Sequence, residues 1–409
     1  MKYNPKFKKR HIKIMMSFFL FPVYTLPIIL IDIFKNKKYA FVLLALFFAL
    51  LSYIMVPFDT MDIVRHYDRF SKLQDISIFD YQINNSYFSL EYIIKIIQVL
   101  GLPKEVLPFI YIFFIYFLTF SILHIVFNNT DIKYNRILLI YFFIFFVSQL
   151  RFIGYSSGLR TGLANALMLY GIFYLFYMKH MDLKGWFFII LSPIIHSSLI
   201  LVIPFILLSK VNFFFRLYKY LFYIAIVLIA TGVGTEIILF LVKFMPQVIG
   251  NKEALVLDIY IHGKWGIGYW NEISGNAYIY EKFLKLLPLY ITIVYLLIVK
   301  RKSELRGLVY LLFFIISFFI DFRTLIDRYG DFLIQLILVL LLLEYQGIKL
   351  TKFKKNFLNL LLVSFLIVNV AGLRVYRDIL FPSWSKVLYL PGLGYLFSTP
   401  DEDEYIKSQ

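Results

Sequence analysis

Two arginines flank a run of small residues near the middle of the chain, in the stretch RFIGYSSGLRTGLANALMLYGIFYLF. Nine positions separate Arg151 from Arg160, so on one continuous helix their side chains would point in opposite directions. Between them lie Gly154, Ser156, Ser157 and Gly158. These small residues predict a turn at which two helices meet, with both guanidinium groups at the same surface. Such a pair can hold the oxygens of a phosphate; the alternative is a pair of arginines that extend to lipid headgroups.

A second candidate group lies in the stretch DTMDIVRHYDRF, residues 59–70. If this stretch is helical, Asp62 and His66 are neighbours one turn apart. Arg65 and Arg69 have the same spacing. A carboxylate beside an imidazole orients the ring and favours its protonated form, as general acid–base catalysis requires. The alternative is a charged helix that lies along a membrane surface.

A third group is the stretch DFRTLIDRYGDF, residues 321–332, which carries five charges between two apolar runs. Charges so close to a membrane are costly unless they pair or face a water-filled cavity. Arg323 and Asp327 are spaced to pair on a helix, which leaves Arg328 on a different face. The group therefore predicts either a substrate-binding site or an ordinary short loop with its own ion pairs.

A lone histidine, His196, stands in the apolar segment SPIIHSS. Pro193 and the two serines that follow the histidine predict local unwinding there. The ring could then act as a general base, or it could bond the backbone that the proline leaves unpaired. We find no Walker loop, serine elbow or HExxH motif, and the absence of cysteine excludes disulfides and thiolate metal sites. We expect neither a metal nor another cofactor.

The composition indicates which elements must position these residues. The chain is 61% hydrophobic and 16% charged, which is typical of a polytopic helical membrane protein. The net charge of +17 is spread over short breaks between apolar runs, so it indicates the positive-inside rule and not nucleic-acid binding. We therefore predict an all-α fold, with residues 1–409 forming one multi-span membrane domain.

Nine apolar runs are read as membrane spans. They are Tyr39–Pro57, Leu107–Phe127, Ile137–Phe152, Arg160–Met178, Leu221–Phe244, Phe283–Val299, Gly307–Ile320, Phe332–Glu344 and Phe357–Leu373. The polar segments expected outside include two loops, 58–86 and 245–282, and the C-terminal tail 375–409.

Two further apolar segments, Met15–Phe34 and Trp186–Leu208, contain internal prolines and have basic residues at both ends. If each crossed the membrane, one basic flank of each would face outward, against the positive-inside rule. We favour re-entrant hairpins for both, with full spans as the alternative. The total is then about nine to twelve transmembrane helices.

In order and hydropathy the chain resembles the EpsG-type membrane proteins, relatives of the Wzy polymerases of O-antigen and capsule. The best matches are Arg160 with the small residues 162–166, and His196 with its two serines. Looser matches are Arg65–Tyr67 and Arg328–Tyr329. The family's usual Arg-Gln pair reads Arg160-Thr161 here, which is a departure from the pattern.

The resemblance implies a GT-C-like enzyme of the bacterial inner membrane that needs no metal. It would join oligosaccharide repeat units, carried on undecaprenyl or a similar polyprenyl pyrophosphate, into O-antigen, capsule or exopolysaccharide at the periplasmic face. Its partners would be the lipid-linked donor and acceptor, membrane lipid and, where present, a chain-length regulator.

Roles for single residues follow from the resemblance and from the chemistry of a pyrophosphate leaving group. The candidate catalytic residues are His196, His66 and Asp62. The candidate substrate contacts are Arg65, Arg151, Arg160, Arg323, Arg328 and Tyr329. Two other functions stay open: a flippase for the same lipid-linked substrate, and a ligase that transfers the finished glycan.

Overall fold

The computed structural model describes residues 5–74, 87–129, 136–178, 181–211, 215–244, 258–263, 265–299, 301–346, 348, 350–375, 377–400 and 405–407. Within these ranges the chain is helical, apart from a single β-bridge between Phe58 and Ile406. The all-α prediction is therefore confirmed. The helices form two compact units, which are described separately. That residues 1–409 form one membrane domain stays a prediction.

Unit 1 comprises Met1–Leu175, Met181–Leu199 and Leu373–Gln409. Its helices are α1 (Pro5–Leu20), α2 (Pro22–Ile33), α3 (Lys38–Tyr53), α4 (Asp62–Lys72), α5 (Phe88–Val99), α6 (Val106–Asn128), α7 (Arg136–Gln149), α8 (Phe152–Ser157), α9 (Leu159–Tyr177, whose last two residues belong to unit 2), α10 (Asp182–Ile195), the start of η3 (Ser197–Leu201), α23 (Arg377–Tyr389) and η7 (Gly392–Phe397).

Unit 2 comprises Phe176–His180 and Ile200–Gly372. Its helices are α11 (Val202–Ser209), α12 (Phe215–Thr231), α13 (Val233–Val242), α16 (Tyr269–Glu272), α17 (Gly275–Lys282), η5 (Leu284–Leu286), α18 (Leu287–Ile298), α19 (Glu304–Ser317), α20 (Arg323–Leu325), the π-helix η6 (Ile326–Gly330), α21 (Asp331–Tyr345) and most of α22 (Lys352–Val375).

Three helices in the described ranges, α6, α9 and α22, have the length and hydropathy that a membrane crossing requires. The pair α12 and α13 would make a fourth if its two parts form one span. Other apolar helices, including α2, α3 and α7, have 10–17 residues and are shorter than a straight span. The fold is thus compatible with a polytopic membrane protein.

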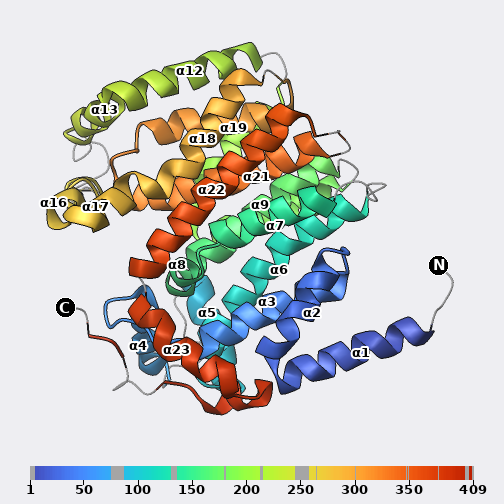
Figure 1. Cartoon of the computed structure of the whole chain (residues 1–409). Helices are drawn as coiled ribbons and strands as arrows, with labels where there is room; N and C mark the ends of the chain where they lie inside the picture. Colours follow the sequence, from blue (N-terminus) through green and yellow to red (C-terminus); the bar gives the residue numbers. More distant parts are fainter. Residues whose placement is uncertain are drawn as a thin grey trace. The chain divides into compact units, whose positions relative to one another are not determined.

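Helices α3 and α6 form the centre of unit 1 and lie side by side (Figure 1). Phe48 of α3 stacks on Tyr116 of α6, with ring centroids 4.1 Å apart. Helix α9 approaches its neighbours closely through glycine: a Cβ on Gly162 would lie 2.7 Å from Ile115 of α6. Gly162 therefore lies on a packing face of α9.

The N-terminal segment of unit 1 folds back on itself between α1 and α2. The chain breaks at Phe21, and the Arg10 guanidinium lies 3.1 Å from the Asp32 carboxylate at the far end of the segment. Lys35 lies 3.7 Å from the same carboxylate, and Tyr39 donates a hydrogen bond to it. The two basic flanks of Met15–Phe34 therefore lie together, as the hairpin prediction requires; its insertion in a membrane stays a prediction.

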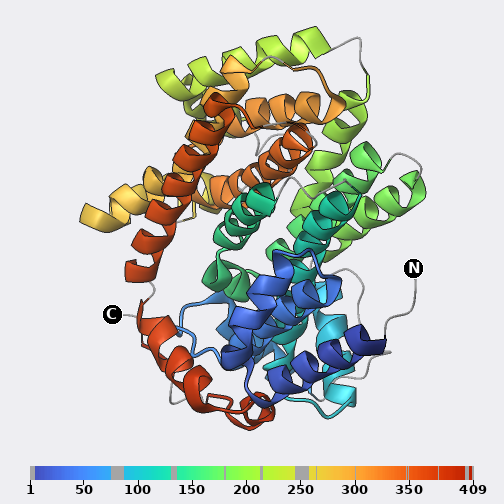
Figure 2. The same ribbon diagram turned by 45° about the vertical axis from the view of Figure 1, so that its right-hand side comes forward.

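In unit 2, α12 lies alongside α19 (Figure 2). The predicted span Leu221–Phe244 is broken at Gly232, where α12 and α13 are bent by 86°; whether the two parts form one span stays a prediction. Gly232 has φ +70°, a left-handed conformation that glycine adopts without steric cost. Two residues on, a Cβ at Gly234 would lie 2.9 Å from the Ser317 carbonyl oxygen, so glycine also permits α13 to meet the end of α19.

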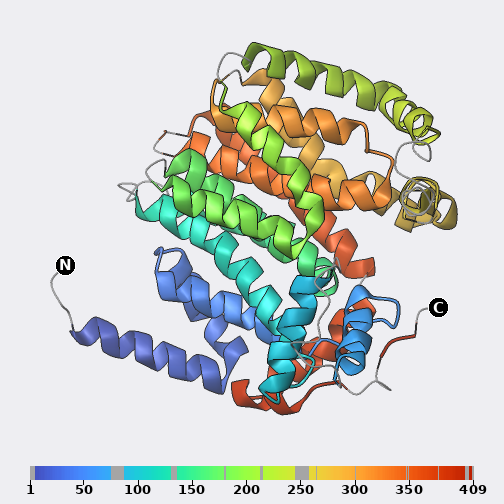
Figure 3. The same cartoon turned by 180° about the vertical axis from the view of Figure 1, so that it is seen from behind.

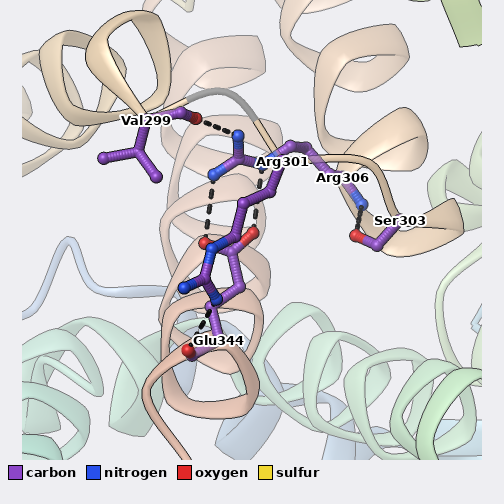
Figure 4. Close-up of polar contacts among 5 residues, drawn as sticks. All are labelled: Val299, Arg301, Ser303, Arg306 and Glu344. Atoms are coloured by element: carbon purple, nitrogen blue, oxygen red, sulfur yellow. Dashed lines mark hydrogen bonds and ion pairs between the residues drawn. The ribbon is translucent and has the colours of Figure 1, made fainter. Parts of the chain in front are cut away.

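A buried ion pair joins α19 to α21 in unit 2 (Figure 4). The Nε and Nη2 atoms of Arg306 each lie 3.0 Å from an oxygen of Glu344, and Arg306 is fully buried. Arg301 donates to the Glu344 carbonyl at 2.9 Å. Ser303 caps α19 by accepting from the Arg306 amide. Glu344 thus binds two arginines of the KRKSELR segment, Arg306 through its carboxylate and Arg301 through its backbone carbonyl.

Candidate functional site

Helix α4 carries the charged stretch that follows α3. Its helical state is as expected, with Asp62 in the first turn and Arg69 and Lys72 in the last turn, where they complement the helix dipole. Ile63, His66 and Tyr67 form its buried face. The Asp62 backbone N–H donates to Ser157 Oγ at 3.1 Å, which ties the start of α4 to α8.

Two arginines from distant parts of unit 1 meet at one aromatic ring. The guanidinium carbons of Arg69 and Arg160 each lie 3.8 Å from the ring centroid of Tyr87, just before α5. The two carbons are therefore separated by less than twice that distance. Arg69 also donates to Glu91 at 2.6 Å. We call His66, Arg69, Tyr87, Glu91 and Arg160 the arginine cluster; Figure 3 shows α4 beside α5, two of the helices that build it.

His66 lies against these cations and is 8% exposed. Burial, and then the positive charges of Arg160, Arg69 and Arg65, lower the pKa of His66 to about 3. The imidazole is therefore neutral at physiological pH. An anion that offset the arginine charges would raise this pKa, because the repulsion between cations would fall.

The Asp62 carboxylate does not contact the His66 imidazole, although the sequence suggested that it would orient the ring. The carboxylate pairs with Arg65 one turn away, and both side chains are exposed. No hydrogen bond or ion pair joins the carboxylate to the imidazole of His66 in the described structure. The i, i+4 spacing permitted that contact, but Arg65 is the stronger electrostatic partner because the arginine is always charged.

His196 stands at a helix break, as predicted: α10 ends at Ile195 and η3 begins at Ser197. The backbone N–H of Ser198 donates to His196 Nδ1 at 3.3 Å, and the Ser198 hydroxyl lies 2.7 Å from the same atom. Nδ1 is therefore the acceptor, and a neutral ring carries its proton on Nε2. Ser89 donates to the Ile195 carbonyl at 3.4 Å, which links this break to α5.

Arg151 and Arg160 do not flank one tight turn. The chain instead forms the short helix α8 between a break at Arg151 and a second break at Gly158. A Cβ on Gly158 would lie 3.2 Å from the Gly154 carbonyl, so the second break is tightly packed. Arg160 then begins α9 and reaches Tyr87, while Arg151 lies at the start of α8.

Unit 2 carries a second charged group around the stretch 321–332. Its members are Glu281, Lys282, Lys285, Asp321, Arg323 and Asp327, which we call the loop cluster. Lys285 contacts Asp327 and lies 3.0 Å from Glu281. Asp321 accepts from Thr235 at 2.7 Å, so the bend at Gly232 also orients a member of this cluster.

The predicted pairing of Arg323 with Asp327 is confirmed, with a separation of 3.8 Å. Arg323 also lies 3.8 Å from the ring centroid of Tyr269. Arg328 points elsewhere, 5.7 Å from the ring centroid of Tyr260. Arg328 and Tyr329 belong to the π-helix η6, a rare local form that is frequent at functional sites.

Tyr87 and Glu91 were not among the residues singled out from the sequence, and Arg69 was noted for its spacing from Arg65 but was not among the predicted substrate contacts. Glu91 did carry a signal, since Glu91 and Lys95 are charged residues one turn apart on an otherwise apolar helix, and both are buried. Tyr87 carried none, because tyrosine is abundant in this chain. Its meeting with Arg160 joins residues far apart in sequence, which spacing alone cannot predict.

In the ranges that the structure describes, no three His, Asp or Glu side chains converge as a metal site would require. Comparisons with protein-family models, curated proteins and solved structures give no match to this chain. We therefore infer function from the geometry of the two clusters.

Proposed function

We propose that the chain is a membrane glycosyltransferase that polymerises polyprenyl-pyrophosphate-linked oligosaccharide repeat units. The observation that carries this proposal is the arginine cluster, in which Arg69 and Arg160 meet at Tyr87 beside the neutral His66. Two guanidinium groups at this separation suit the two phosphates of a pyrophosphate. An imidazole next to them supplies the group that can take a proton.

The reaction would be a single displacement. The oxygen of an acceptor sugar hydroxyl attacks the anomeric carbon of the donor, and the bond from that carbon to the pyrophosphate oxygen breaks. Arg69 and Arg160 stabilise the charge that develops on the leaving pyrophosphate. The hydroxyl proton passes to the imidazole of His66. Bound pyrophosphate raises the pKa of His66 by offsetting the arginine charges, so the base becomes effective only with donor in place.

His196 has a different part in this proposal. Because its Nδ1 accepts from Ser198, its Nε2–H is a donor in the neutral ring. It would orient a sugar hydroxyl or a phosphate oxygen, and His66 would be the base. The loop cluster, with its aromatic residues Tyr269 and Trp270, would contact the oligosaccharide of one substrate.

The location belongs to the same proposal. The apolar helices would be embedded in the bacterial inner membrane in a GT-C-like arrangement, with the arginine cluster toward the periplasmic face. Two observations support this orientation. The Asp32 carboxylate pairs with basic residues from both flanks of Met15–Phe34, and two arginines of one expected cytoplasmic segment, Arg301 and Arg306, both bond Glu344. Basic flanks that share a carboxylate lie on the same side of the membrane, as the positive-inside rule expects.

The decisive experiment replaces Arg160 by alanine in the cell that makes the glycan. At unchanged membrane abundance, we expect the ladder of polymer to collapse to single repeat units. Arg377→Ala, an exposed arginine of α23, is the matched control and should leave the ladder intact. An unchanged ladder in Arg160→Ala would contradict the proposed role.

A binding measurement gives a second readout on the purified protein. Polyprenyl pyrophosphate should raise the melting temperature in detergent, and polyprenol of the same length should not. Arg160→Ala should weaken this binding by about tenfold or more, since charge-assisted hydrogen bonds contribute roughly 1.5–3 kcal/mol. Equal stabilisation by the uncharged polyprenol would show that the site does not recognise pyrophosphate.

A flippase for the same substrate is the second candidate. The observation in its favour is the discontinuous helix at Gly232, together with the break at His196, because broken helices line the sites of many transporters. The two functions differ in what their loss accumulates. Without a flippase, single units stay on the cytoplasmic leaflet; without a polymerase, they cross and are transferred as single repeats.

A further inference from the structure

The chain returns to the start of α4 near its C-terminal end. Ile406 forms a parallel bridge with Phe58, in the link between α3 and α4. The Ile406 N–H donates to the Pro57 carbonyl at 3.1 Å, and the Asp59 N–H donates to the Ile406 carbonyl at 3.1 Å. Two backbone hydrogen bonds thus hold residue 406 against residues 57–59, in the link that precedes α4. In Figure 1 the red end of the chain runs beside this helix.

Side chains extend the same contact onto α4 itself. The Lys104 ammonium lies 5.2 Å from the ring centroid of Tyr67 on α4 and 5.8 Å from that of Tyr405. Tyr67 is 4% exposed. Burial, with the nearby Glu105, Tyr405 and Tyr53, raises the pKa of Tyr67 well above its usual value, so this hydroxyl stays neutral. Tyr67 directly follows His66 on α4, so a contact that holds Tyr67 also restrains the backbone that carries the imidazole.

We propose that residues 405–407 are a positioning strap that holds α4 with His66 and Arg69 directed at Tyr87 and Arg160. The strap acts through backbone hydrogen bonds to residues 57–59 and through the cation–π contacts of Lys104. It deepens the proposed function, and its catalytic consequence rests on that function. The effect of the strap on the placement of α4 does not depend on the proposed function.

The backbone nature of the contact gives a sharp pair of variants. Ile406→Pro removes the N–H that bonds to Pro57, whereas Ile406→Ala keeps both backbone hydrogen bonds. The natural chain has no cysteine, so one cysteine at Ile63, which is fully buried on α4, reports exposure of this helix to a maleimide. Each variant is combined with Ile63→Cys in the full-length protein, and the labelling rate is compared with that of Ile63→Cys alone.

We expect Ile406→Pro to raise the labelling rate about fivefold, as loss of one backbone hydrogen bond predicts, and Ile406→Ala to leave it nearly unchanged. Deletion of residues 405–409 should raise the labelling rate more than Ile406→Pro does. Equal labelling of the proline and alanine variants would overturn the strap.

The polymer ladder, measured without the reporter cysteine, tests the catalytic consequence. Ile406→Pro should shorten the ladder and Ile406→Ala should not. If labelling rises but the ladder is unchanged, the positioning role in the reaction is overturned. If Arg160→Ala itself leaves the ladder intact, the proposed function fails, and labelling alone then decides whether the strap holds α4.

Discussion

Two arginine sites, one in each unit, differ in what holds their guanidinium groups. In unit 2, Arg306 is fully buried and both arms of its fork lie on Glu344 (Figure 4). In unit 1, Arg69 and Arg160 share the ring of Tyr87, and Arg69 also donates to Glu91. A fork that is filled by a carboxylate stabilises the fold, because it satisfies a charge that burial would otherwise penalise.

A guanidinium on an aromatic ring is held in a different way. A cation–π contact attracts the positive charge and does not itself use an N–H donor of the kind that binds phosphate oxygens. We therefore expect Arg306 to stabilise the fold and Arg160 to bind the ligand. Mutation of Arg306 should lower the stability of the protein, and mutation of Arg160 should weaken ligand binding.

The largest expected effect on stability comes from Arg306→Met. It leaves Glu344 buried without its cation, which costs about 3–5 kcal/mol. We expect a large fall in melting temperature in detergent. The double variant Arg306→Met with Glu344→Leu should recover much of the loss, since apolar residues can replace a buried ion pair. If the single and double variants melt alike, the pair is not the structural link described here.

A smaller effect is expected at the ring of the arginine cluster. Tyr87→Ala removes the surface on which two guanidinium groups lie, and each cation–π contact is worth roughly 0.5–1 kcal/mol. We expect polyprenyl pyrophosphate to bind about tenfold more weakly. Tyr87→Phe keeps the ring and should bind nearly as the natural protein does. Full affinity in Tyr87→Ala would show that the ring does not orient the arginines.

The pH dependence of stability should report His66. The unfolded chain takes up the histidine proton near pH 6.5, but in the folded protein the pKa is lowered to about 3. Between these values the unfolded state binds more protons, so stability is lost as pH falls below 6.5, by at most about 1.4 kcal/mol per pH unit. In His66→Gln, the melting temperature should fall less steeply between pH 7 and pH 5 than in the natural protein. An equally steep loss in His66→Gln would assign it to other groups.

The smallest effect is expected from Arg65→Gln. Arg65 pairs with Asp62 at an exposed position, and such pairs contribute less than about 1 kcal/mol. We expect the melting temperature to change little and the polymer ladder to shorten less than in Arg160→Ala. A complete loss of polymer in Arg65→Gln would place this arginine in the binding site beside Arg160 and revise the comparison.

Much of the helical framework was predictable because it depends on local pattern. The long apolar runs that became α6 and α9 identify themselves by length and hydropathy. The pairing of Arg323 with Asp327 follows from their spacing on one helical turn. The break at Gly232 was missed, although glycine at a position where a helix reverses direction is a known signal.

The arginine cluster could be predicted only in part. Arg160 and His66 attract attention as polar residues in an apolar chain. Their meeting depends on α4, α5 and α9, and no local rule connects helices so far apart in sequence. The spacing permits Asp62 to contact either Arg65 or His66, and in the structure it pairs with Arg65. Spacing alone does not decide between the two. The sequence therefore indicates which residues could act, and tertiary packing selects among them.

The β-bridge at Ile406 has a consequence for biosynthesis. Unit 1 contains both the first residues of the chain and residues 373–409, so the ribosome must complete the intervening unit 2 before unit 1 can close. The corner around Asp32 joins partners only 22 positions apart and can form early. The contact of Ile406 with residues 57–59 can form only after unit 2 has been synthesised. A nascent chain that has not yet reached Ile406 would carry every residue of the arginine cluster but would lack the contact proposed to hold α4.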